Sequence, residues 1–244
     1  ERHHDGDGSA GIGVLSDVLA GELRRQILNG TIAPGTPLPA ERDLVTQTGL
    51  SRGSVREALR VLETEHLVSI RSGRHGGPVA RQPGDESLAK TISLFVHGRG
   101  ITLLALMQTR LALEPALAAL AASNRTADEL QGLIRVTDDV ERAFSDTPLF
   151  LSENVKWHCA IAAASHNELL RAFMIAMSSM VYKATAIENF ASDDVRTVVV
   201  EAHRRIVDAI IAQDAEAAHR RMARHLTAVT AAVQALPNAP LVLD

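Results

Sequence analysis

The sequence is poor in the residue types that mark secreted, membrane-spanning and disulfide-rich proteins. It has one cysteine, Cys159, in 244 residues, which excludes an internal disulfide framework. No apolar run approaches the length of a membrane span, and the N-terminus ERHHDGDGSAG lacks the apolar core of a signal peptide. We therefore expect a cytoplasmic protein without a membrane partner. Aromatic residues make up 3% of the chain, so the core must be built mainly of Leu, Ile, Val and Ala.

Residues 37–67, PLPAERDLVTQTGLSRGSVREALRVLETEHL, have the pattern of two short helices joined by a tight turn. Pro39 suits the first position of the first helix, where its missing N–H costs nothing, and Gly49 ends that helix. Ser51 is a good N-cap for the second helix. The apolar positions of the second helix follow helical spacing, and they are Val55, Leu59 and Leu62. This segment therefore predicts a helix-turn-helix.

The opposite face of the second helix carries Arg52, Arg56 and Arg60. In a helix-turn-helix, the second helix enters the major groove with its N-terminal residues toward the base edges. Arginine pairs with guanine through two hydrogen bonds, and a serine or a backbone N–H at a helix start can hold a phosphate. The residues placed to touch DNA are therefore Ser51, Arg52, Gly53, Ser54 and Arg56. The alternative is that these arginines only form a solvated face.

Residues 67–71 and 78–81 predict two short strands joined by the glycine-rich loop 72–77. A hairpin in this place completes a winged helix. Gly73 and Gly76 permit a close approach of the loop backbone to phosphates or to the minor groove. The ordered combination of helices, arginines and wing favours DNA binding over a solvated face.

The charge of the chain is unevenly distributed. The formal net charge is −4, which alone would be unusual for a nucleic-acid-binding protein. Residues 14–81 contain nine Lys and Arg against seven Asp and Glu, whereas residues 84–244 contain fifteen against nineteen. A weakly basic segment favours binding to a specific DNA site through a small basic surface, strengthened by dimerisation. We therefore expect a homodimer on double-stranded DNA.

Residues 82–85 interrupt the strand pattern with Pro and Gly and mark a domain boundary. The predicted fold is mainly α, with an N-terminal winged helix-turn-helix, including a small β-wing, and a C-terminal all-helical bundle. The predicted domains are a disordered N-terminal segment at 1–13, the winged helix at 14–83, the helical domain at 84–237 and a tail at 238–244. Within the helical domain, helices are predicted at 85–97, 101–123, 126–145, 148–165, 167–190, 193–213 and 214–235.

Three histidines, His158, His203 and His225, lie on the apolar stripes of three predicted helices. Neutral imidazole is a common metal ligand, and three rings from three helices can share one ion. Asn154 lies one helical turn before His158 on the same face, so its side-chain oxygen can act as a fourth ligand. Glu153 lies off that face. The alternative is that each histidine separately satisfies a hydrogen bond in the core.

The motifs ERDL at 41–44 and LSRGSVREAL at 50–59, with the wing at 71–79, resemble the N-terminal domain of GntR-family bacterial transcription regulators over residues 14–81. His66 stands where the family usually has a glycine, and we expect only a local effect on stability there. The resemblance implies contacts with operator DNA by Arg42, Ser51, Arg52, Gly53, Ser54, Arg56, Ser72 and Gly73.

The segments 154–158, 201–203 and 222–225 resemble the metal site of the FCD effector domain of FadR-type members of this family. The resemblance implies a divalent ion, zinc or alternatively nickel or manganese, on Asn154, His158, His203 and His225. Family members usually have Asp at the position of Asn154, and the missing charge leaves an ion that favours an anionic ligand. By the same resemblance Arg110 faces the effector pocket and binds a carboxylate. Without this resemblance, the sequence would indicate that Arg110 is a surface arginine or is paired with a glutamate.

Three functions fit these features. A ligand-responsive transcription regulator, a repressor, would place a homodimer on a pseudo-palindromic operator, and a small carboxylate would shift the DNA-competent population. A metal-dependent hydrolase with an appended DNA-binding module would use metal-bound hydroxide, but the sequence has no HExxH run and no clearly placed acid or base. An effector-free architectural DNA-binding dimer is the third. We favour the regulator and expect no enzymatic activity.

Overall fold

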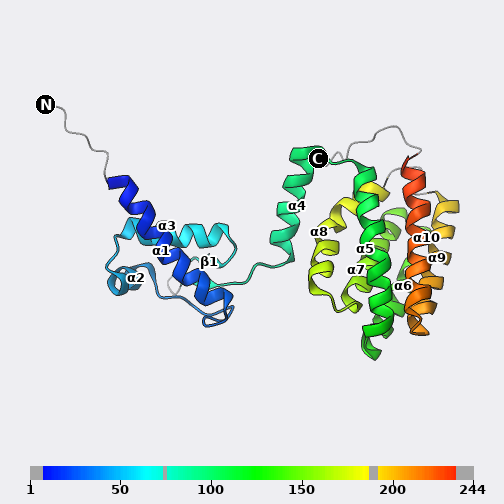
Figure 1. Ribbon diagram of the computed structural model, residues 1–244, viewed down its shortest axis with the longest axis horizontal. Coiled ribbons are helices and arrows are strands. Elements are labelled where there is room, and N and C mark those ends of the chain that lie inside the picture. Colours follow the sequence, from blue (N-terminus) through cyan, green and yellow to red (C-terminus); the bar gives the residue numbers. More distant parts are fainter. Residues whose placement is uncertain (1–7, 74–75, 187–191, 235–244) are drawn as a thin grey trace. The chain divides into compact units, whose positions relative to one another are not determined.

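The computed structural model describes residues 8–73, 76–186 and 192–234 of the chain (Figure 1). The chain divides into two compact units, Glu1–Ser87 and Leu88–Asp244. The division falls within helix α4 (Asp85–Arg99), a few residues beyond the expected boundary at 83–84. The described residues form ten helices and one two-stranded sheet, so the predicted mainly α fold class is confirmed.

The N-terminal unit packs helices around an aliphatic core. Its elements are α1 (Gly8–Leu28), α2 (Glu41–Thr48), α3 (Arg52–Thr64), β1 (Val68–Arg71) and β2 (Gly77–Ala80), and the two strands pair antiparallel as the predicted wing. Helix α1 was not predicted. The predicted disordered segment 1–13 is wrong for residues 8–13, which form the first turns of α1, while residues 1–7 lie outside the described residues. Leu23 and Ile27 of α1 are buried in this core, which explains why the helix forms.

The ends of α2 and α3 follow from local chemistry. Gly49 is left-handed at φ 71° and donates its N–H to the Val45 carbonyl, which closes α2. Ser51 caps α3, because its Oγ accepts from the Ser54 N–H at 3.1 Å. His66 has a φ of 60°, so a histidine holds the left-handed position where the family usually has a glycine. One prediction is wrong: α2 begins at Glu41 after an Ala40 N-cap, so Pro39 precedes the helix.

The C-terminal unit is a helical bundle. After α4 it contains α5 (Leu103–Asn124), α6 (Ala127–Arg142), α7 (Thr147–Ala164), α8 (Glu168–Thr185), α9 (Asp193–Ile211) and α10 (Ala215–Gln234). These bounds lie close to the predicted segments because clear N-caps, such as Thr126 and Asn167, begin the helices. Residues 187–190 of the predicted helix 167–190, residue 235 of the last predicted helix and the predicted tail 238–244 lie outside the described residues.

Helix α5 is the one described helix that is long and apolar enough to cross a membrane by length and composition. Its apolar residues instead pack inside the bundle, with α10 alongside it and α7 and α9 also in contact (Figure 1). Its buried face also carries two charged side chains, Arg110 and Glu114. A core helix explains these features better than a membrane span.

Candidate metal centre and nucleic-acid interface

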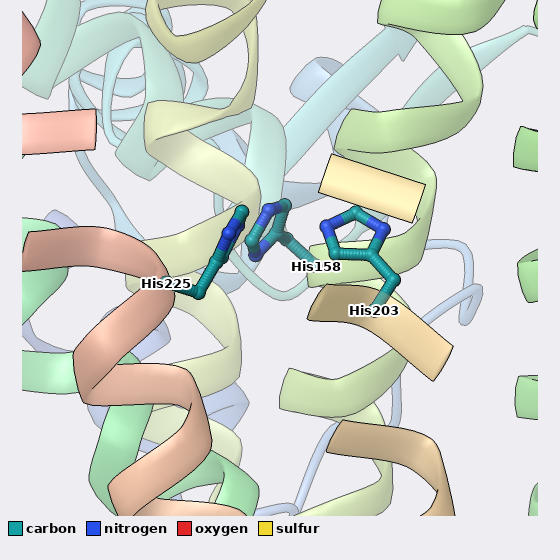
Figure 2. Close-up of side chains that lie close together, drawn as sticks. All are labelled: His158, His203 and His225. Atoms are coloured by element: carbon teal, nitrogen blue, oxygen red, sulfur yellow. The ribbon is translucent and has the colours of Figure 1, made fainter. Parts of the chain in front are cut away.

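Three buried histidines meet in the bundle (Figure 2). His158 comes from α7, His203 from α9 and His225 from α10. One potential ligand nitrogen of each ring lies within 4.8 Å of those of the other two. The structure therefore brings together three histidines that the sequence places on separate apolar stripes.

Trp157 sets the plane of the His203 ring. The indole stacks on the imidazole with ring centroids 3.6 Å apart and planes 2° apart, and its Nε1 donates to Thr137 Oγ1 at 2.9 Å. His203 is fully buried, yet neither of its ring nitrogens has a hydrogen-bond partner among the described residues. Buried polar atoms without partners are costly and rare. A satisfied core hydrogen bond therefore does not account for His203.

Burial keeps all three imidazoles neutral near pH 7. It lowers the pKa of His225 to about 3, with His158 and Arg110 acting in the same direction. Burial, His225 and His158 hold the pKa of His203 well below its ordinary value. The pKa of His158 is also lowered by burial, although Glu114 opposes the shift. Neutral rings retain the lone pairs that metal coordination requires.

A buried ion pair on α5 touches the cluster. Arg110 Nε donates to Glu114 Oε1 at 2.5 Å, and the two side chains are 2% and 3% exposed. Burial opposes ionisation, but the positive charge of Arg110 and the neighbouring imidazole of His158 lower the pKa of Glu114 to about 2. Glu114 Oε2 lies 2.5 Å from His158 Nδ1, although the angles are outside those of a directional hydrogen bond. A carboxylate there favours a proton on Nδ1 and leaves Nε2 with its lone pair.

Glu114 is a member of this site that sequence reasoning missed. Arg110 was expected either to face an effector pocket or to pair with a glutamate, and the structure shows the pair with Glu114 and places Arg110 on a small cavity beside the histidines. It pairs with Glu114 through Nε, while its buried Nη2 has no hydrogen-bond partner among the described residues. The four-residue spacing on one helix face was the available indication that Glu114 joins the site.

A small cavity of about 30 Å³ lies between these groups. Its polar lining is Arg110, Asn154, His158 and His225. Asn154 is buried on the same helix as His158, as its spacing predicts. Glu153 does not line the cavity and instead pairs with Lys156 at 2.7 Å. The predicted ligands Asn154, His158 and His225 thus line one cavity. His203 does not line it, but its ring packs against the rings of His158 and His225.

In the N-terminal unit, the start of α3 presents an exposed polar surface. Ser51, Arg52, Gly53 and Arg56 are exposed, and the Arg42 side chain on α2 is 86% exposed. These residues come from the two helices of the helix-turn-helix. The surface has the composition that phosphate and base contacts require.

Two contacts change the details of this surface. Ser54 is buried, with its N–H bonded to Ser51 Oγ and its Oγ 2.9 Å from the same atom, so we assign it to the helix cap rather than to the exposed surface. Arg56 pairs with Glu41 of α2 at 2.9 Å between Nη2 and Oε1. Sequence reasoning missed Glu41, because its partner lies fifteen residues away.

The wing presents the remaining predicted contacts. Ser72 and Gly73 are exposed, and Gly73 has a φ of 111°, which favours glycine. A Cβ at Gly76 would lie 2.2 Å from the Arg71 carbonyl oxygen, so a side chain does not fit there. Residues 74–75 of the loop lie outside the described residues.

Comparison with known proteins gives a consistent assignment for both units. Residues 15–75 match the family described as bacterial regulatory proteins, gntR family, and residues 105–228 match the FCD domain. The HTH-type transcriptional repressor NanR of Cronobacter sakazakii is 30% identical over 91% of this chain and 86% of its own length. A putative L-lactate dehydrogenase operon regulatory protein of Escherichia coli K12 is 31% identical over 88% of this chain and 84% of its own length.

A solved structure leads to the same assignment. The GntR protein of Streptococcus agalactiae matches with a TM-score of 0.70 and 26% identity, covering 89% of this chain and 99% of that one. Family and relatives together indicate a transcription regulator and not an enzyme. The chain therefore belongs to the GntR family of bacterial regulatory proteins and carries an FCD domain.

Proposed function

We propose that this regulator represses transcription as a cytoplasmic homodimer on a pseudo-palindromic operator, and that a small carboxylate changes its affinity for that operator. The cluster of His158, His203 and His225 beside Arg110 carries the proposal, because it is a buried polar site some of whose atoms have no partner among the described residues. Relatives named as NanR repressors support repression. The modest charge of the DNA-binding unit supports a dimer, since two units double the electrostatic contribution.

The DNA contacts are assigned to the exposed side chains of the helix-turn-helix and the wing. Arg52 and Arg56 at the start of α3 are positioned for base edges, as the second helix of this motif enters the major groove. The surrounding residues contact phosphates and fix the register. These are Arg42, Ser51, Gly53, Ser72 and Gly73.

A divalent ion, zinc or alternatively nickel or manganese, would be held by the three histidines with Asn154 as a further ligand. Zinc binds imidazole nitrogen at about 2.0–2.1 Å in tetrahedral sites, which requires nitrogens about 3.3 Å apart. The ring nitrogens lie within 4.8 Å of one another, so closure by at most about 1.5 Å completes the site. Glu114 beside His158 supplies the carboxylate that commonly orients a ligand histidine.

The same arrangement supports an anionic effector. Arg110 and Glu114 offset each other, and the ligands are neutral, so the charge of a bound ion is left without compensation. A carboxylate supplies that charge and can also accept a hydrogen bond from Arg110 Nη2. A relative named for an L-lactate dehydrogenase operon is consistent with this, because lactate is a small carboxylate.

The proposal is tested by an electrophoretic mobility shift assay of the full chain with DNA from its own promoter region. We expect a sequence-specific shift that changes when zinc and a set of small carboxylates are added. His203→Ala should still shift the DNA but lose the response to the acids. Absence of a specific shift, with or without metal and acid, would overturn the proposed function.

A further inference from the structure

An open groove runs between α9 and α10 of the helical unit, and the proposed function does not use it. Its volume is about 500 Å³, within the roughly 300–1,000 Å³ that is typical of small-molecule sites. Every lining residue belongs to one of these two helices. The floor is apolar and consists of Val195, Val198, Val199, Ala202, Ala228, Val229 and Ala232. Val198 is 62% exposed, so no described residue covers the floor at this position.

Positive charge gathers at one end of the groove. Helices α9 and α10 follow each other through a short connection, and Arg221 of α10 donates to the backbone oxygen of Arg205 of α9. The third arginine, Arg224, also lines this end. The acidic residues of the lining are Glu201, which lies 3.3 Å from Arg205, and Asp194, which lies in the first turn of α9 at the opposite end.

Arg224 is the available cation of this groove. It is exposed, and within the described part of the chain it forms no hydrogen bond or ion pair. Arg205 already pairs with Glu201, and Arg221 already donates to a backbone oxygen. A guanidinium without a partner beside an apolar floor is suited to a ligand that carries one anionic group on an apolar body.

We propose that the α9/α10 groove binds an organic acid with a single carboxylate and an apolar body. The carboxylate pairs with Arg224, and the body covers the valine and alanine floor, which removes apolar surface from water. A sugar acid fits poorly, because its hydroxyl groups would lose water against this floor without gaining partners. A neutral apolar molecule fits poorly as well, because it leaves Arg224 unused.

This groove is separate from the histidine site, but the two share a wall. Val195, Val199, Val229 and His225 line both the groove and the inner cavity of about 30 Å³. The inner cavity, at about 30 Å³, is far smaller than the groove and does not accommodate the apolar body of the acid. His158 and His203 do not line the groove, so binding there can be tested apart from the proposed function by changing His203.

The test is isothermal titration of the full chain with 4-phenylbutyrate. Two comparison compounds isolate the two features of the ligand: 4-phenylbutanol lacks the charge, and gluconate lacks the apolar body. We expect saturable binding of 4-phenylbutyrate and weaker binding of both others. Arg224→Gln and Ala228→Phe, which remove the cation and fill the exposed floor, should each weaken binding about tenfold or more.

Matched control variants carry the same changes outside the groove. Arg135→Gln removes an exposed arginine of α6 that has no partner in the described ranges, and Ala231→Phe enlarges an exposed α10 residue that does not line the groove. Both should bind 4-phenylbutyrate as the parent chain does. His203→Ala should also retain binding, which keeps this result independent of the proposed function.

Three results would overturn the proposal. Undiminished binding by Ala228→Phe would place the acid elsewhere, and loss of binding in His203→Ala alone would assign it to the histidine site. If the chain does not bind 4-phenylbutyrate but forms a dimer that Ala228→Phe dissociates, the groove is an interface between two copies of the chain. An absent operator shift would contradict the proposed function and leave this proposal to stand on its own titrations.

Discussion

The two units of this regulator carry their polar residues in opposite ways. In the winged helix, Arg42, Arg52 and Arg56 lie in water on the surface of an aliphatic core. In the bundle, the Arg110–Glu114 pair and the histidine cluster replace part of the core itself. Exposed residues can therefore change with little effect on folding, whereas each buried one affects stability and ligand binding together. Mutations that separate these effects test the comparison.

The largest effect is expected from breaking the buried ion pair. Arg110→Ala leaves Glu114 ionisable, buried and unpaired, which should lower the free energy of unfolding of the bundle by about 3–5 kcal/mol. Chemical denaturation measures it. The matched change at an exposed pair, Arg142→Ala beside Asp139, should cost about 0–1 kcal/mol. If the two variants lose the same free energy of unfolding, burial does not make the Arg110–Glu114 pair more important for stability than the exposed pair.

The second expected effect is stabilisation by metal. At a zinc concentration about 100 times the dissociation constant, binding to the folded state alone should add about 2.7 kcal/mol to stability. Thermal denaturation of the zinc-free protein, with and without added zinc, measures this increment. His203→Ala should lose it, while the exposed His219→Ala on the same bundle should keep it. An increment preserved in His203→Ala would contradict the proposed ligand set.

The third effect concerns the exposed surface. Arg52→Ala should weaken operator binding by about 1–3 kcal/mol and relax base preference at one position of each half-site. It should leave the unfolding transition unchanged, because the side chain is exposed. Fluorescence anisotropy with operator variants measures the first effect and thermal denaturation the second. Arg135→Ala, exposed on the bundle, is the control and should bind the operator normally.

The sequence predicted the surface site and the buried site by different routes. At the start of α3, one short segment contains the cap, the apolar stripe and the arginines, so local rules identify most of it. The bundle helices were predicted almost to their ends for the same reason. Local rules missed α1, because its glycines obscure a helix that forms by burying Leu23 and Ile27.

Convergence across helices could not be predicted from spacing. The apolar stripe of each helix places its histidine in the core, but only packing decides whether three rings meet. Trp157 and Glu114 were missed because their roles depend on contacts with other helices, the stack on His203 and the approach to His158. Ser54 was assigned to DNA by its place at the start of the second helix and by resemblance, whereas its burial depends on the hydrogen bonds of the cap.

The smallest expected effect comes from Glu41, which holds Arg56 across the two helices of the motif at 2.9 Å. Glu41→Gln removes one negative charge from the DNA-facing surface and also frees Arg56. The added positive charge should strengthen binding to any DNA, while the freed arginine should lose base discrimination. We therefore expect the ratio of operator to scrambled-duplex affinity to fall by a few-fold.

Glu57→Gln is the matched control for this change. Glu57 lies on the same recognition helix, is exposed, and forms no ion pair within the described part of the chain. Both variants gain the same charge, so both should bind a scrambled duplex more tightly at low salt, and that gain should shrink as salt is raised. Only Glu41→Gln should lower the ratio of operator affinity to scrambled-duplex affinity. If the two ratios fall equally, the ion pair does not position Arg56, and the exposed surface has no internal restraint comparable to the buried Arg110–Glu114 pair.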